Sequence, residues 1–290
     1  MKHPARNKLV AAIALLFVPA LVKADVKISF KLQGGWTYVS AGEVNRANKA
    51  LFNWEGALWP TSQGGYRPVR HGVECGGDFI FEFTPRIGVG IGCGYLTASR
   101  GSLMEFADPE NDIDGGLSAR PELSALPVRL SLILRFPLSA KIDLMTRMGG
   151  SYYFLARYND EIRENSFSGL GQIHGFYGFA HRAEIGSAAL GLDAGIGIEY
   201  RLNSRVFLCL DATGRFAKLH GWEGSSTIYN EFLNMTEHGT LYYESFPALP
   251  DFPRLIMVQT DPPAGPGGEP RQAVIDFSGI SLQAGIRICL

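Results

Sequence analysis

Hydrophobic and polar residues alternate with a period of two along much of the chain. Residues 26–40 read VKISFKLQGGWTYVS, in which Val26, Ile28 and Phe30 share one parity and Lys27 and Lys31 share the other. Because successive side chains of a β-strand point to opposite faces, this pattern predicts a strand with one apolar and one polar face. The same alternation recurs in seven further segments, at residues 73–83, 87–95, 126–136, 140–157, 188–202, 205–217 and 280–290.

The connections between these segments are alternately short and long. Tight turns are expected near Pro85, Leu138 and Asn203, whereas the remaining connections are long, polar and rich in Gly, Asn, Asp and Pro, at residues 40–72, 99–122, 158–187 and 218–272. Each alternating segment is near or above the roughly 9–11 residues that cross a bilayer obliquely. The sequence therefore predicts an all-β fold, an eight-stranded antiparallel transmembrane β-barrel with short periplasmic turns and long extracellular loops.

The last long loop contains two short β-prone segments, at residues 240–246 and 254–259, around a proline-rich stretch. They are too short to cross a membrane. We therefore expect an extracellular hairpin that extends the barrel wall, with a ten-stranded barrel as the alternative.

The N-terminus has the features of an export signal. Lys2, Arg6 and Lys8 precede an apolar run over residues 9–22, and small residues follow near Ala24. The run is shorter than a membrane-spanning helix, so we expect a cleaved signal peptide over residues 1–24 and a mature barrel domain over 25–290. Together with the predicted barrel, export of this kind leads us to expect the protein in a Gram-negative type of cell outer membrane.

Composition fits a barrel as well as it fits a soluble protein. The chain has 290 residues, of which 46% are hydrophobic and 19% charged, with 35 glycines, and its mean hydropathy is +0.03. Hydropathy averages cancel when every second residue faces lipid. The formal net charge of −1 and the lack of a basic run argue against a nucleic-acid partner.

Charged residues occupy the face that would line the lumen. Their signs nearly cancel, so we expect a paired network. Counting from the turns predicts contacts of Arg135 with Glu82 and of Arg129 with Asp78, across the glycine face of residues 87–95. An interior this narrow is filled by side chains, which favours a plugged lumen. The charged lumen positions are Lys31, Glu74, Asp78, Glu82, Arg129, Arg135, Lys141, Asp143, Arg147, Asp193, Glu199, Arg201, Asp211, Arg215 and Arg287.

Large aromatic residues lie at both ends of the apolar faces, as in the aromatic girdles of membrane barrels. This favours a membrane barrel over a lipocalin-like barrel or a periplasmic sandwich, whose apolar faces point inward. On the loop side the girdle would comprise Trp36, Tyr38, Tyr95, Tyr152, Phe154 and Phe216, and on the turn side Phe83, Phe136 and Tyr200.

Taken together, the signal peptide, the eight alternating segments, the three tight turns and the C-terminal strand ISLQAGIRICL resemble the small outer-membrane β-barrels of the OmpA transmembrane-domain, OmpX and OmpW type. The chain departs from them in ending on Leu290 rather than on an aromatic residue. The resemblance implies outer-membrane lipid and lipopolysaccharide as surroundings, and recognition of the C-terminal strand by the barrel insertion machinery.

The candidate catalytic and metal-binding residues lie in the predicted loops. The mature histidines His71, His174, His181, His220 and His238 lie there beside Asp108, Asp112, Asp114, Asp160 and Glu161, which could supply an Asp/His hydrolytic site or a metal site. Their spacings match no ligand motif, so we expect no enzyme, no metal and no cofactor.

The chain has four cysteines, and export permits disulfides. A Cys209–Cys289 bridge between neighbouring strands is one interpretation, and four free thiols is the other.

The sequence thus favours a monomeric outer-membrane barrel whose loops serve structural, adhesive or other binding roles toward an unknown extracellular ligand. Two alternatives stay open. One is a narrow channel or transporter for small apolar solutes of the OmpW kind, and the other is a surface hydrolase.

Overall fold

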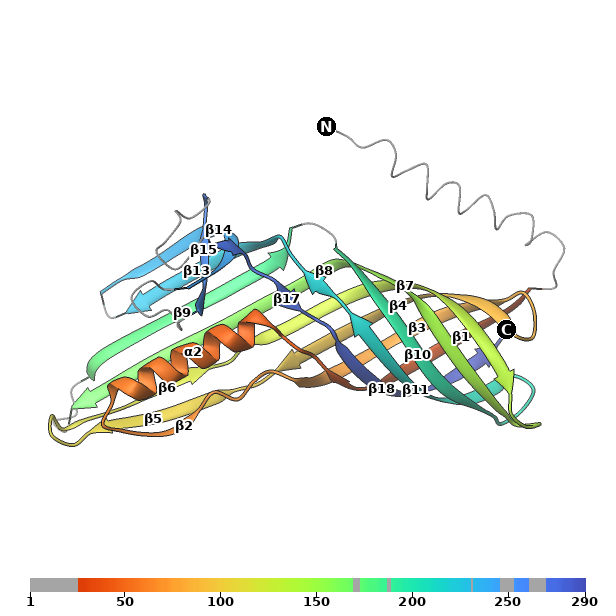
Figure 1. The fold of residues 1–290 in the computed structure, drawn as a ribbon, viewed down its shortest axis with the longest axis horizontal. Helices are drawn as coiled ribbons and strands as arrows, with labels where there is room; N and C mark the ends of the chain where they lie inside the picture. The colour runs from red at the N-terminus through yellow and green to blue at the C-terminus, as the bar shows by residue number, and fades with distance from the viewer. Residues whose placement is uncertain (1–25, 169–172, 187–188, 231, 246–252, 261–269) are drawn as a thin grey trace.

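The computed structural model describes residues 26–168, 173–186, 189–230, 232–245, 253–260 and 270–290. The expected signal peptide, residues 1–24, lies outside this range. Eight long strands form a closed antiparallel barrel in the order β10-β11-β18-β1-β3-β4-β7-β8, and pairing of β8 with β10 closes it (Figure 1). The expected eight-stranded barrel is therefore confirmed. The barrel strands are β1 Lys27–Tyr38, β3 His71–Glu82, β4 Ile87–Ser99, β7 Glu122–Pro137, β8 Ile142–Ser168, β10 Ala189–Arg201, β11 Val206–Phe216 and β18 Gly279–Cys289.

Three tight turns join strand pairs at one end of the barrel. Thr84, Ser139 and Asn203 each accept backbone N–H hydrogen bonds through their side chains within these turns, which fixes the short connections between β3 and β4, β7 and β8, and β10 and β11. The C-terminus lies at this same end (Figure 1). We call it the turn end.

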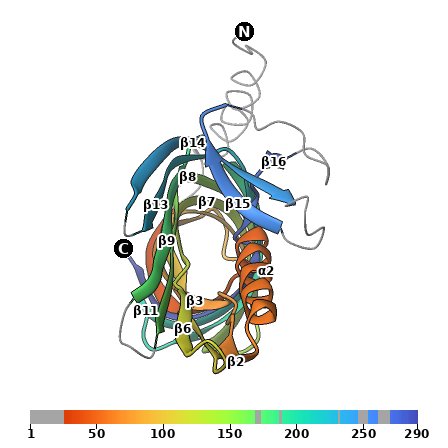
Figure 2. The ribbon, with the colours of Figure 1, turned by 90° about the vertical axis from the view of Figure 1, so that its left-hand side faces the viewer.

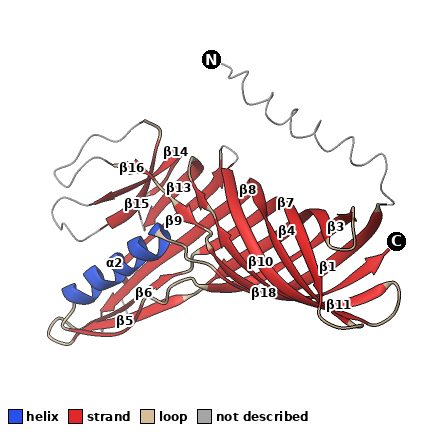
Figure 3. Ribbon diagram, turned by 45° about the vertical axis from the view of Figure 1, so that its right-hand side comes forward, coloured by secondary structure: helices blue, strands red, loops and turns tan. Residues whose placement is uncertain are grey.

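At the opposite end, the chain continues as ordered structure that we call the extension. Residues expected to form irregular loops instead form one helix and further strands that prolong the wall (Figure 3). The strand β8 is 27 residues long because its outer half leaves the barrel and pairs with β6 and β9. The remaining elements are α2 Glu43–Leu58, β2 Thr61–Gly65, β5 Ser102–Asp108, β6 Ile113–Ala119, β9 Ile173–Ile185, β12 Lys218–Leu219, β13 Trp222–Asn230, β14 Asn234–Ser245, β15 Pro253–Val258, β16 Arg271–Gln272 and β17 Ile275–Asp276.

The hairpin expected near residues 240–259 is present as β14 and β15, with Tyr242 opposite Ile256. It joins β13 in the extension rather than entering the barrel. The ten-stranded alternative is thus excluded, because the barrel closes without these strands.

Helix α2 forms part of the wall of the extension, between β15 and β2 and across from β9 (Figure 2). Its buried positions Val44, Ala47, Phe52 and Glu55 recur every three to five residues, close to the period of one helical face. Gly42 precedes it with φ +52°, a left-handed conformation that favours glycine. Buried Glu43 anchors the first turn by accepting a 2.7 Å hydrogen bond from the Val274 backbone N–H.

The outer face of the barrel is apolar and exposed. Of the expected girdle, seven aromatic side chains are exposed, namely Trp36, Tyr95, Phe136, Tyr152, Phe154, Tyr200 and Phe216, while Tyr38 and Phe83 are half-buried. A protein in water does not leave so wide an apolar band uncovered, and a bilayer covers it. Among the described residues, no helix is both long and apolar enough to span a membrane.

A layer of buried apolar side chains fills the interior where the barrel meets the extension. Tyr153, Trp222 and Phe277 are fully buried at its centre, with ring centroids 6.3 Å apart for Trp222 and Phe277 and 6.4 Å apart for Tyr153 and Phe277. We call this cluster the apolar layer. It separates two different interiors, a charged one below and a partly open one above.

Candidate functional site

Below the apolar layer, near the turn end, four charged side chains form a ring of ion pairs. Arg135 lies 2.6 Å from Glu82 and 3.1 Å from Glu199, and Arg287 lies 3.0 Å from each of the same carboxylates. Each guanidinium thus bridges two acids, and each acid meets two guanidinium groups. Such reciprocal pairing offsets the cost of burying four charges.

A second cluster lies between this ring and the apolar layer. Glu74 accepts hydrogen bonds from Arg129 Nη1 at 2.9 Å, from Arg215 Nη1 at 2.8 Å and from Ser281 Oγ at 2.6 Å. Asp78 lies 3.5 Å from Arg129 and 3.6 Å from Arg147. Together with the ring, this cluster forms what we call the lumen network.

The two contacts expected from the turn register, Arg135 with Glu82 and Arg129 with Asp78, are both present at 2.6 and 3.5 Å. The glycine face of β4 makes room for them, because a Cβ at Gly92 would overlap the Oδ1 atom of Asp78.

Further lumen positions are also buried and partnered. Lys31 lies 2.7 Å from Asp211, and Ser151 donates a 2.7 Å hydrogen bond to Asp193. Asp143 is buried 3.9 Å from Arg201, whose side chain is half-exposed at the turn end. Lys141 is exposed in a turn and lies outside the lumen.

Of the two cysteine interpretations, the Cys209–Cys289 bridge is wrong, because all four cysteines are free. The strand register explains this. Cys209 lies opposite Gly285, four residues before Cys289, which separates the two by about 13 Å along the strand. A disulfide requires Cα atoms within about 7 Å.

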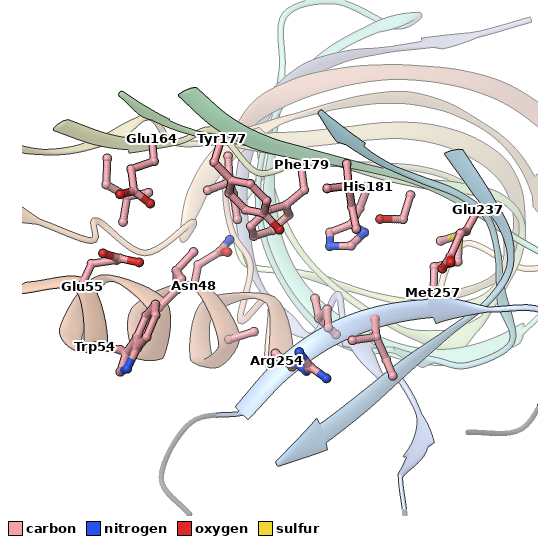
Figure 4. Close-up of a pocket in the computed structure, with 18 of the residues that line it drawn as sticks. Asn48, Trp54, Glu55, Glu164, Tyr177, Phe179, His181, Glu237, Arg254 and Met257 are labelled. Carbon is pink, nitrogen blue, oxygen red and sulfur yellow. The ribbon is translucent and has the colours of Figure 1, made fainter. Parts of the chain in front are cut away.

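Above the apolar layer, the extension encloses a cavity of about 610 Å³ (Figure 4). Its walls come from α2, β6, β8, β9, β13, β14 and β15, and most of its lining side chains are apolar. Tyr158, Leu255 and Met257 belong both to the cavity lining and to the apolar layer, so the layer is the floor of the cavity.

Three polar residues form a row across neighbouring strands beside this cavity. Asp160 of β8 is opposite His181 of β9, which is in turn opposite Ser226 of β13, and all three are buried. Asp160 Oδ2 accepts hydrogen bonds from Asn48 Nδ2 at 2.6 Å and from Tyr158 Oη at 3.0 Å. His181 and Ser226 line the cavity.

The pKa values of two residues in this row are shifted by burial. Burial raises the pKa of Asp160 to about 6 in spite of its two hydrogen bonds, and burial lowers the pKa of His181 to about 4. The imidazole is therefore neutral at physiological pH, with Nδ1 buried and without a hydrogen-bond partner in the described part of the chain. A neutral imidazole can both donate and accept hydrogen bonds toward a bound molecule.

Two carboxylates face each other across the cavity. Glu55 projects from α2 toward Glu164 of β8 (Figure 4). Burial and the nearby Glu164 raise the pKa of Glu55 to about 7, and burial also raises the pKa of Glu164. Neither forms an ion pair with the residues that the structure describes.

Of the candidate catalytic or metal-binding loop residues whose side chains the structure describes, only Asp160 and His181 lie opposite each other on neighbouring strands. His71 stacks on Trp36 of the girdle at 5.5 Å, His220 and His238 are exposed, and Asp108 accepts hydrogen bonds from Asn111 within its own turn. The side chain of His174 lies outside the described residues. No group of three metal-ligating side chains occurs in the described ranges.

The sequence interpretation missed the contribution of α2 to the cavity. Asn48 and Glu55 lie on its buried face, in a stretch expected to be a polar loop. The spacing of Val44, Ala47, Phe52 and Glu55 was the available signal, and it was weak because polar residues interrupt the buried face.

No protein-family model and no curated protein matches this chain. Among solved structures, it is similar to the outer membrane protein OprG from Pseudomonas aeruginosa, at 13% identity over 90% of this chain and 95% of that one, with a TM-score of 0.37. A major outer membrane protein from Thermus thermophilus aligns at 10% identity over 91% and 99%, with a TM-score of 0.41. Neisserial surface protein A aligns at 10% identity over 91% and 97%, with a TM-score of 0.35.

Proposed function

We propose that this chain is an outer-membrane surface protein that binds a small molecule from outside the cell in the cavity of the extension, above a closed lumen. The proposal rests on one observation, namely that the apolar layer divides the interior of the protein into two parts. Below the apolar layer, charged side chains are buried and paired with one another. Above it lies a cavity of about 610 Å³, within the size range of ligand pockets.

The arrangement of polar residues at the cavity favours ligand binding over hydrolysis. Asp160, His181 and Ser226 resemble a hydrolytic set in residue type, but no hydrogen bond joins any two of them among the described residues. A nucleophile and its base must lie within hydrogen-bond reach. We therefore assign the row to ligand contact, with no cofactor and no metal.

The remaining parts of the proposal follow from the barrel. A cleaved signal peptide over residues 1–24 delivers the chain to the outer membrane, where lipid and lipopolysaccharide surround the apolar band. The lumen network acts as a plug and the protein works as a monomer. The extension then faces the medium and presents the cavity to extracellular solutes.

The binding test compares two variants of α2. Ala47 is buried and lines the cavity, so Ala47→Phe should fill part of it. Ala50 lies on the same helix but does not line the cavity, so Ala50→Phe is the matched control. The protein is reconstituted in nanodiscs and titrated calorimetrically with 2-phenylethylammonium, 2-phenylethanol and 3-phenylpropionate, with empty nanodiscs as the partition control.

We expect saturable one-to-one binding of at least one probe by the wild type and by Ala50→Phe, and its loss in Ala47→Phe. Binding of no probe, or equal binding by both variants, would contradict the proposal.

A second candidate is passage of small apolar solutes through the barrel, and the apolar lining of the cavity favours it. Such a transporter would move 2-phenylethanol into proteoliposomes faster than empty liposomes do. Under the first proposal, the rates are equal.

A further inference from the structure

The lining of the cavity in the extension contains more acidic than basic side chains. Its lining includes three carboxylates, Glu55, Glu164 and Glu237, and one guanidinium, Arg254. Arg254 forms an ion pair with Glu244, which does not line the cavity. The positive charge of Arg254 is therefore already offset by Glu244. Glu55 and Glu164, in contrast, form no ion pair with the described residues.

The most enclosed of these acids is Glu55. Its side chain is only 6% exposed, and it faces Glu164 rather than a basic residue (Figure 4). A buried carboxylate without a counter-charge is costly, and a second carboxylate opposite it adds to the cost. A cation held between the two would relieve both contributions at once.

His181 provides a second observation that points to a ligand. Its side chain is 6% exposed, its Nδ1 has no hydrogen-bond partner among the described residues, and its ring turns into the cavity (Figure 4). Behind it, Asp160 Oδ1 is also buried without a partner in the described ranges. Unsatisfied buried polar groups are rare in folded proteins, so an imidazole nitrogen without a partner on the cavity wall points to a molecule bound in the cavity.

The wall between the acids and His181 is aromatic. Tyr177 and Phe179 have ring centroids 6.0 Å apart, and Phe179 and His181 lie 5.5 Å apart, so three rings follow one another along β9. Leu51 and Ile162 add aliphatic surface. Aromatic faces attract cations as well as apolar groups, so the wall suits an apolar body that carries a positive charge.

From this arrangement we infer that the ligand of the cavity is an organic ammonium compound with an apolar body, its charged head between Glu55 and Glu164 and its body along Tyr177 and Phe179. This inference rests on the proposed binding function and adds the class of the ligand. Neutral and anionic molecules of the same size should bind less tightly, because they leave the two carboxylates unpaired.

The test uses the three probes named above, which share a phenyl ring and differ in charge. At about pH 8, where Glu55 is ionised, we expect 2-phenylethylammonium to bind at least about tenfold tighter than 2-phenylethanol, a difference of about 1.4 kcal/mol. The carboxylate 3-phenylpropionate should bind weakest.

Single variants then identify the residues responsible. Glu55→Gln and Glu164→Gln should each weaken ammonium binding about fivefold or more while leaving 2-phenylethanol within about twofold, because each removes one charge from the head-group position. Glu105→Gln is the matched control, since Glu105 lies in the extension on its exposed face. Retained alcohol binding shows that a variant still folds its cavity.

The outcomes separate this inference from the proposed function. If the alcohol or the carboxylate binds as tightly as the ammonium, or if both glutamine variants behave like Glu105→Gln, the inferred ligand class is wrong while the binding function stands. If no probe binds at all, the binding function itself fails.

Discussion

Replacing Glu74 by alanine is expected to destabilise the barrel strongly. Glu74 is 4% exposed and accepts three short hydrogen bonds, from Arg129, Arg215 and Ser281. Removing it leaves Arg129 with the more distant Asp78, at 3.5 Å, as its ion-pair partner among the described residues. Arg215 retains a 2.8 Å hydrogen bond to the Phe277 carbonyl, so part of the loss is compensated. Breaking a buried ion pair costs about 3–5 kcal/mol, and we expect about 3 kcal/mol here.

A surface pair of similar geometry supplies the control. Arg157 and Glu184 lie 2.8 Å apart, but their side chains are 59% and 61% exposed. Such pairs contribute about 0–1 kcal/mol, so Glu184→Ala should be nearly neutral. Glu74→Gln, which keeps an acceptor and removes the charge, should fall between the two alanine variants.

The free energy of unfolding is measured by urea titration of protein reconstituted in lipid vesicles, followed by tryptophan fluorescence. A loss of less than about 1 kcal/mol in Glu74→Ala, or a loss equal to that of Glu184→Ala, would show that the buried ion pairs of Glu74 do not stabilise the barrel.

Three further results are expected. The pKa of His181 is lowered from 6.5 to about 4, so protons favour the unfolded state below pH 6.5. Between pH 8 and pH 5, the free energy of unfolding in urea should therefore fall by about 2 kcal/mol more for the wild type than for His181→Gln. Equal decreases would contradict this. Gly92→Ala should cost about 1–3 kcal/mol in the same assay because its Cβ meets a carboxylate and a backbone oxygen, whereas Gly101→Ala, with open space around it, should be neutral. Alkylation of the denatured, unreduced protein should modify all four cysteines, and two protected thiols at Cys209 and Cys289 would show a bridge that this register does not allow.

The barrel could be predicted from the sequence because each of its strands shows the alternation of apolar and polar residues by itself. A strand that faces lipid on one side and a charged lumen on the other alternates strictly, as β1 and β18 do, and tight turns at Pro85, Leu138 and Asn203 fix which strands are neighbours. The lumen pairs followed from the same information, because the tight turns before β4 and after β7 lie at the same end of the barrel, and counting residues from them gives the depth of each lumen position.

The extension could not be predicted in the same way. Its strands β6 and β9 pair with the outer half of β8, and their faces meet other protein rather than lipid, so the contrast between faces is weaker. Helix α2 buries Asn48 and Glu55 as well as apolar residues, which blurs its helical period. The cavity depends on the mutual placement of six strands and this helix, and no single segment contains that information.

A closed lumen blocks the flow of ions across the membrane, and planar-bilayer conductance measures this flow. The wild-type protein, inserted into a lipid bilayer in concentrated potassium chloride, is expected to give no resolvable conductance steps above the baseline of the bare bilayer. Under the proposed function, the buried, paired side chains of the lumen network and the apolar layer block the passage of ions. Reproducible steps of uniform size from the purified wild-type protein would contradict a closed lumen and favour passage through the barrel.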